Sequence, residues 1–131
     1  MLIGALLATL TLTPAQQSTE TPSPTLSRWE HVGGDDKGQF SIDPQTMSWQ
    51  GRRVRVFVRL QLTSDGQNEP IIGVMRYVYD CNAKTARVEQ IDVFDMDGNL
   101  QHSTPTEPGD MQDEPIAAGT PNEAVTARVC R

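Results

Sequence analysis

The chain has 131 residues, of which 37% are hydrophobic and 21% charged, and its formal net charge is −6. This length suits a single domain with one ordinary core, and the composition is that of a globular chain rather than a disordered one. Proteins that bind nucleic acid contact its phosphates through a basic surface, so the acidic balance argues against that class.

The first residues predict an export signal. Leu2 to Leu12 form an apolar run of signal-peptide length, and Thr13-Pro14-Ala15 offers small residues at a cleavage site. The alternative is a buried N-terminal strand. The run is shorter than the ~20 residues that cross a bilayer, so no transmembrane span is expected. The next segment is polar and carries two prolines, which is typical of a linker. The predicted organisation is a signal peptide over 1–15, a linker over 16–28 and a domain over 29–131.

The two cysteines, Cys81 and Cys130, are predicted to form a disulfide. An even number of cysteines in an exported chain is most simply a pair, and the alternative is two unpaired buried thiols. Their spacing matches neither a C-x-x-C redox motif nor the ligand set of a structural zinc site.

The first expected strands are short. Trp29 to Val32 and Gly38 to Ile42 are strands separated by a turn at Gly33 to Asp36, and Pro44 interrupts the second because proline cannot donate to a ladder. The clearest element follows from Arg53 to Leu62. Valines and leucines alternate strictly with a second set that contains three arginines, and this period of two predicts a half-buried antiparallel strand.

Further strands are expected at Ile72 to Cys81, Thr85 to Phe94 and Leu100 to Ser103. The alternation slips near Gln90, which indicates a bulge, and Asp97-Gly98 is a hairpin signal before the last strand.

A helix is expected from Pro121 to Cys130. Thr120 and Glu123 have the spacing of a capping box, and Pro121 stands at the first helical position. Several antiparallel strands followed by one helix predict an α+β fold.

Taken in order, these residues resemble the surface-adhesin protein E family of Gram-negative bacteria. The shared features run from Trp29 to Cys130. They are the tryptophan in the first strand, Asp43-Pro44 after the second, the valine-rich strand, an aromatic strand ending at Asp80-Cys81, a basic turn with Lys84 and Arg87, Pro115-Ile116, Gly119, Glu123 and the final helix. The resemblance implies an antiparallel sheet of about six strands with a C-terminal helix tied to it by the disulfide. It also implies an exported surface protein that binds host matrix or serum proteins and can pair as a homodimer.

The candidate binding residues are Arg52, Arg53, Arg55 and Arg59. The last three project from one face of the valine-rich strand, about 7 Å apart per two residues, and such a row could pair with a polyanion through guanidinium forks. The alternative is an ordinary solvated face, paired in part with Glu89 or Asp92, or covered by the acidic segment from Glu107 to Glu114.

Other candidate sites are weaker. Asp95, Asp97 and Asn99 resemble the start of a calcium loop, but the sixth and twelfth positions hold Leu100 and Thr106, so a hairpin turn is expected. His31 with Asp35-Asp36 lacks the ligands of a closed metal site, and His102 stands alone. An aromatic groove of Tyr77, Tyr79 and Phe57 could hold a flat ligand such as haem with a histidine as axial ligand, although Tyr77 and Tyr79 fit a core better. The sequence shows no nucleophile elbow and no catalytic triad.

The sequence therefore predicts a non-enzymatic, exported envelope or surface domain, located in the periplasm or on the outer surface, without a cofactor. Its expected partner is a matrix or serum protein, an anionic glycan or an envelope component. A structural or accessory periplasmic protein without a host ligand is the main alternative, and a small hydrolase is a more distant one.

Overall fold

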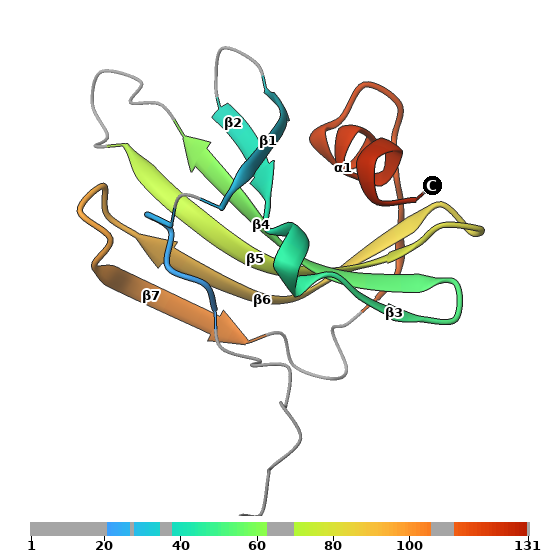
Figure 1. The fold of residues 1–131 in the computed structure, drawn as a ribbon, viewed down its shortest axis with the longest axis horizontal. Coiled ribbons are helices and arrows are strands. Elements are labelled where there is room, and N and C mark those ends of the chain that lie inside the picture. The colour runs from blue at the N-terminus through green and yellow to red at the C-terminus, as the bar shows by residue number, and fades with distance from the viewer. Residues whose placement is uncertain (1–20, 27, 35–37, 63–69, 106–111, 131) are drawn as a thin grey trace, which may run out of the picture.

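The structure is a computed structural model that describes residues 21–26, 28–34, 38–62, 70–105 and 112–130. These residues form an eight-stranded antiparallel sheet and one C-terminal α-helix (Figure 1). In chain order the elements are β1 (Glu30–Gly34), β2 (Gly38–Ile42), the 3₁₀ turn η1 (Pro44–Thr46), β3 (Ser48–Gln50), β4 (Arg53–Leu62), β5 (Ile71–Asp80), β6 (Thr85–Phe94), β7 (Leu100–Pro105), β8 (Glu114–Pro115) and α1 (Pro121–Val129). The predicted α+β fold is confirmed.

The sheet has the order β1-β2-β4-β5-β6-β7, with β3 paired to β4 and β8 paired to β6. Strands β4 and β6 have the predicted bounds. The β5–β6 register shifts after Arg76 and leaves Glu89 as the extra residue, which confirms the predicted bulge one position earlier. One prediction is wrong in detail, because Gly33 and Gly34 belong to β1 rather than to a turn. The short strands β3 and β8 were not predicted.

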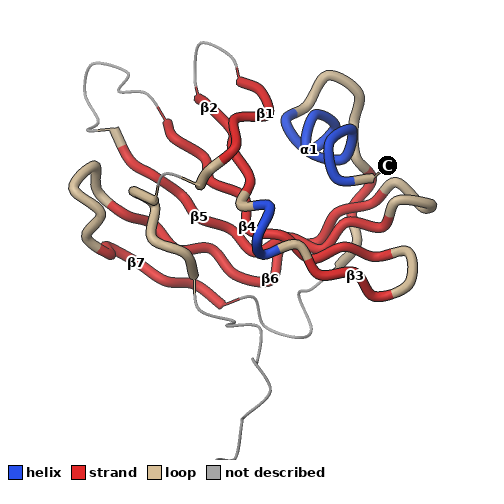
Figure 2. Tube along the Cα trace, viewed as in Figure 1, coloured by secondary structure: helices blue, strands red, loops and turns tan. Residues whose placement is uncertain are grey.

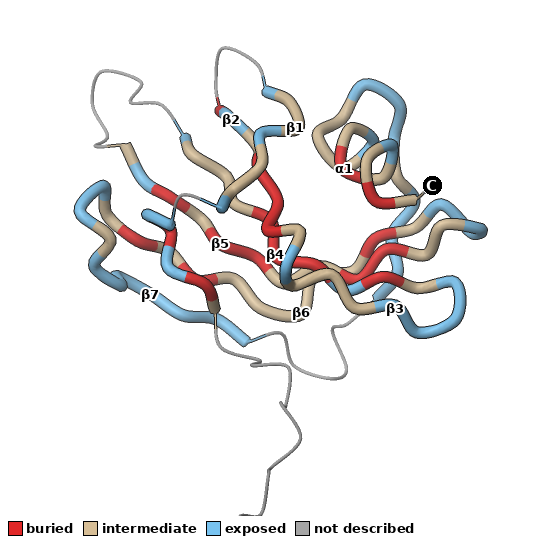
Figure 3. The backbone as a smooth tube through the Cα atoms, viewed as in Figure 1, coloured by how far each residue is buried: buried red, intermediate tan, exposed pale blue. Residues whose placement is uncertain are grey.

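The main core lies between the sheet and α1. The alternating valines of β4, Val54, Val56 and Val58, are fully buried, and the helix contributes Val125 and Val129 to the same cluster. Figure 2 shows α1 beside β1 and over one end of the sheet, and Figure 3 shows buried positions along the middle strands and on the inner side of the helix. Burial of one such side chain contributes about 1.5–3 kcal/mol.

The opposite face of the sheet carries a second, smaller core, so the prediction of a half-buried β4 is wrong over part of its length. Phe57 is only 4% exposed and packs with Ile72, Val74 and Phe94. This cluster is not a continuation of the core under α1, because the register of β4 and β5 places these residues on the other face. Phe57 therefore does not share a groove with Tyr77 and Tyr79, whose rings stack under the helix side at 5.3 Å.

An N-terminal strap, residues 21–26 with 28 and 29, lies against this second face. The Trp29 indole packs on the Phe57 cluster and donates a hydrogen bond of 2.9 Å to the Ser23 carbonyl. The guanidinium of Arg59 donates to the Pro24 carbonyl at 2.8 Å. Part of the segment that the sequence marked as a linker thus makes specific contacts with the sheet.

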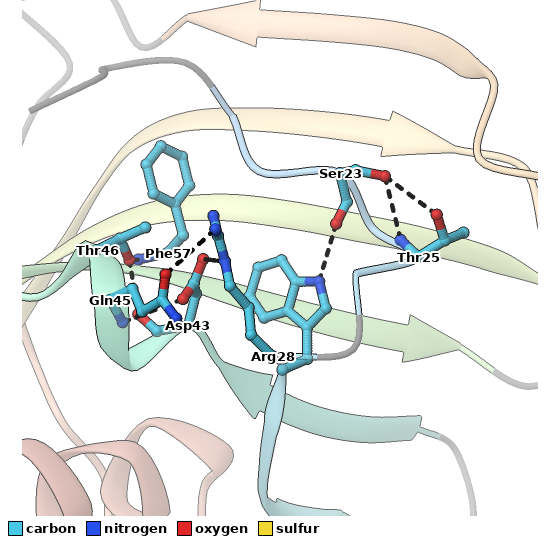
Figure 4. A network of polar contacts seen from close by, with 8 residues as sticks. Ser23, Thr25, Arg28, Asp43, Gln45, Thr46 and Phe57 are labelled. Carbon is cyan, nitrogen blue, oxygen red and sulfur yellow. Dashed lines mark hydrogen bonds and ion pairs between the residues drawn. The ribbon is translucent and has the colours of Figure 1, made fainter.

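The strap is anchored on Asp43, whose side chain is fully buried where β2 meets η1. Its carboxylate accepts from Arg28 Nε at 2.6 Å and from the Gln45 backbone N–H at 3.1 Å (Figure 4). The adjacent Thr46 hydroxyl donates to the Asp43 carbonyl and accepts from the Phe57 N–H. A buried charge with these partners fixes the bend between β2 and β3 and joins it to β4 and the strap.

The disulfide between Cys81 and Cys130 is confirmed. Cys81 follows β5, Cys130 follows α1, and their Cα atoms are 5.6 Å apart. Two polar contacts support the same docking. Arg128 forms a two-point ion pair with Glu30 of β1, and the Tyr79 hydroxyl donates to Asn122 Oδ1 at 2.9 Å. The helix is therefore joined to both β1 and β5.

The predicted capping box is wrong. Thr120 is the N-cap by position and its backbone is extended, but its side chain makes no capping hydrogen bond. The hydroxyl instead donates to the Ala117 carbonyl at 2.6 Å.

We expect Thr120→Ala to lower the free energy of unfolding by less than about 0.5 kcal/mol, because an exposed hydroxyl that caps nothing contributes little. A urea titration measures this. A loss near 1 kcal/mol, the usual value for a removed N-cap, would contradict the observed geometry.

Candidate functional site

The structure divides the predicted arginine row into two parts. Arg53, Arg55 and Arg59 do project from the same face of β4, opposite α1. Arg59 lies beneath the strap, where burial lowers the pKa of its guanidinium. Arg52 sits in the exposed turn between β3 and β4. Only Arg53 and Arg55 remain in the sheet surface that the described strap leaves uncovered.

Two arginines that the sequence prediction missed complete this surface. Arg76 of β5 is paired with Phe57, and Arg87 of β6 is paired with Val78, which in turn faces Arg55. The register therefore gathers an arginine cluster, Arg53, Arg55, Arg76 and Arg87, on one face of three strands. In the sequence both arginines alternate with core residues, but only the strand register shows that they lie beside Arg53 and Arg55.

Two carboxylates each serve two guanidinium groups. Glu89, at the bulge, forms a two-point contact with Arg55 at 2.7 and 3.2 Å and lies 3.4 Å from Arg76. Asp113 forms a two-point contact with Arg53 at 2.8 and 3.3 Å and lies 3.9 Å from Arg87. The Arg53 hydrogen bond and charge lower the pKa of the Asp113 carboxyl.

Two of the carboxylates that the sequence offered as internal partners of the arginine row do pair with it. Glu89 pairs with Arg55, and Asp113 of the acidic segment pairs with Arg53. Residues 107–111 of that segment lie outside the described residues. Asp92 is not a partner of the row: it is buried beside the strap. Burial acts to raise its pKa, but hydrogen bonds from Ser103, Thr21 and Gln90 outweigh that and lower it.

The cluster has more hydrogen-bond donors than acceptors. Each guanidinium has five N–H donors, and the hydrogen bonds to Glu89 and Asp113 use two each on Arg55 and Arg53. Within the described structure, Arg76 Nε and Arg87 Nε are buried without a hydrogen-bond partner. Among the described residues, three carboxylates form ion pairs with the four arginines, the third being Asp80, and Asp92 interacts with Arg76 over a longer distance.

A groove of about 240 Å³ opens beside the cluster, between β3 and the strands that follow. Its lining consists of Arg53, Arg55 and Arg87, with Ser48, Trp49 and Gln50 from β3 and Val78 from β5. Glu89 and Asp113 are outside this lining, and no described residue that lines the groove is a carboxylate.

The other candidates take simpler forms. Asp95 Oδ1 accepts from the Asp97 and Asn99 backbone N–H groups and so stabilises the predicted β6–β7 hairpin turn. His31 hydrogen-bonds to Gln39, while Asp35 and Asp36 lie outside the described residues. The described part of the chain holds no group of three or more metal-ligating side chains, and none of its helices has the length and hydropathy to cross a bilayer.

Comparison with known proteins gives one finding. The family model for surface-adhesin protein E matches residues 29–131, which is most of the chain. Searches of curated proteins and of solved structures gave no match. The matched region contains every strand and the helix among the described residues, and both cysteines of the disulfide. The chain belongs to the surface-adhesin protein E family.

Proposed function

We propose that this domain is an exported, non-enzymatic binding module of the adhesin type, and that its arginine cluster binds an anionic partner. The partner is an anionic glycan or the acidic surface of a matrix, serum or envelope protein. The family match supports a surface adhesin in general, and the cluster supplies the chemistry. Location in the periplasm or on the outer surface fits the apolar N-terminal run in the sequence.

The observation that carries the proposal is the excess of guanidinium donors on an accessible sheet face. The side chains of Arg53 and Arg55 remain 37% and 46% exposed despite their carboxylate partners. Guanidinium groups bind oxyanions in two-point contacts and lose less hydration than lysine does on binding. An incoming anion would find the N–H donors of Arg53 and Arg55 that their two-point contacts with Asp113 and Glu89 do not use.

We expect Arg55→Gln to weaken binding to immobilised heparin about fivefold at low salt, since one exposed charge contact is worth up to ~1 kcal/mol. Arg128→Gln is the matched control. It also removes one guanidinium held in a two-point contact with one carboxylate, but it lies on α1, on the other side of the sheet. Surface plasmon resonance at several salt concentrations measures both affinities, and wild-type binding should weaken as screening increases.

Equal affinities for the two variants would contradict the proposal. A wild-type protein that does not bind heparin, and whose cluster becomes protected in a concentration-dependent homodimer, would instead support the structural or accessory role. Sedimentation velocity across a dilution series separates these outcomes.

A further inference from the structure

We propose that the groove beside β3 is a subsite for one tetrahedral oxyanion, the sulfate ester of an anionic glycan. This inference rests on the proposed function and narrows it from a charged surface to one position and one ligand chemistry.

The first argument is the composition of the groove. Arg53, Arg55 and Arg87 all line it, whereas the carboxylates that pair with them do not. On the β3 side, Ser48 and Gln50 add a hydroxyl and an amide, which are neutral donors. A cavity with three cations, neutral donors and no lining carboxylate has the chemistry of an anion site.

The second argument is the state of Arg87. Its Nε is buried without a hydrogen-bond partner among the described residues, and its nearest carboxylate oxygen, on Asp113, is 3.9 Å from Nη1. A buried charged donor without an acceptor is unfavourable. The terminal nitrogens of Arg87 approach a carboxylate only at that distance, whereas Arg53 and Arg55 each hold a two-point carboxylate contact. A ligand oxygen in the groove would give these terminal nitrogens a close acceptor, so Arg87 should contribute more to binding than its neighbours.

The third argument concerns the shape of the ligand. A sulfate ester has three terminal oxygens, one for each guanidinium of the groove, whereas a carboxylate has two and is satisfied by one arginine fork. The groove of about 240 Å³ is smaller than the ~300–1,000 Å³ of pockets for drug-sized ligands. It therefore suits a single charged unit of a polymer. A phosphate ester also has three terminal oxygens, so the experiment must distinguish a sulfate ester from a phosphate ester.

The test compares Arg87→Gln with Arg76→Gln for binding to heparin. Both changes remove one positive charge from the same sheet face, but only Arg87 lines the groove. We expect Arg87→Gln to weaken binding tenfold or more, as for loss of a charge-assisted hydrogen bond, and Arg76→Gln about twofold. Arg87→Lys, which keeps the charge and loses the fork, should recover little of the loss. Urea midpoints verify that all three variants fold.

The outcomes separate the two proposals. Equal losses for Arg87→Gln and Arg76→Gln would overturn the subsite and leave the charged surface standing. No dependence on either arginine would also overturn the subsite, and a lack of effect of Arg55→Gln as well would remove both proposals. Desulfated heparin and hyaluronan, which retain only carboxylates, should bind at least tenfold more weakly than heparin. Equal binding would overturn sulfate as the ligand. Tighter, Arg87-dependent binding to vesicles containing a phosphorylated glycolipid would overturn the glycan as its source.

Discussion

Replacing both cysteines, as Cys81→Ser/Cys130→Ser, should lower the free energy of unfolding by roughly 4 kcal/mol. The bond joins residues 49 apart in the chain, and in the chain-entropy model closing a loop of about 50 residues restricts the unfolded state by that amount. Small domains are marginally stable, so this is a large part of a typical 5–15 kcal/mol. Urea unfolding followed by circular dichroism measures the change.

Loss of the bond should loosen α1 before the sheet. Without the bond, α1 is held by Val125, Val129 and the contacts to Glu30 and Tyr79, whereas the sheet keeps its backbone hydrogen bonds. Reduced wild-type protein is the control and should match the double variant within about 0.5 kcal/mol. A loss below 1 kcal/mol in both would mean that the disulfide adds little to the stability of the fold.

The second large effect is expected at Asp43. Asp43→Asn should cost about 2–3 kcal/mol, because the buried carboxylate accepts charge-assisted hydrogen bonds from Arg28 and from the backbone of η1. The amide keeps the size of the side chain but loses the charge. The indole of Trp29 packs where the strap is anchored, so its fluorescence should shift to the red as the strap loosens.

A double-mutant cycle isolates the ion pair. Arg28→Met keeps most of the side-chain volume but leaves the fully buried Asp43 carboxylate without its cation, so this change alone should cost about as much as Asp43→Asn. Asp97→Asn, in the exposed β6–β7 turn, is the control with the same change of charge and should alter stability by less than 0.5 kcal/mol. Additive losses at Asp43 and Arg28 would show that the strap is not held by this pair.

The sequence predicts the strands best where one face is apolar and the other polar. β4 has its predicted bounds because its alternation continues over ten residues, and β6 has its predicted bounds although a bulge interrupts its alternation. The strap was not predicted as part of the fold because its residues are polar and proline-containing, and it docks mainly through backbone carbonyls and Arg28. Phe57, which lies among the arginines of β4, was the one sign that this face carries a second core.

The candidate site was only half predicted, for a different reason. The alternation of β4 places Arg53 and Arg55 on one face, but Arg76 and Arg87 join them through strand register, and the bulge at Glu89 changes that register partway along the sheet. A one-residue shift would turn these side chains to the opposite face. The prediction of a capping box is wrong because the Thr120 hydroxyl donates to a competing acceptor, the Ala117 carbonyl.

The position of the disulfide also has a consequence for β1, which it does not touch. The contact between Glu30 and Arg128 joins residues 98 apart in the chain, and forming so distant a contact requires closure of a long loop. The bond between Cys81 and Cys130 provides a shortcut that roughly halves the chain path between those two side chains. Halving a flexible loop lowers the free-energy cost of closing it by about 0.6 kcal/mol. One covalent link at β5 therefore also assists the docking of α1 on the first strand.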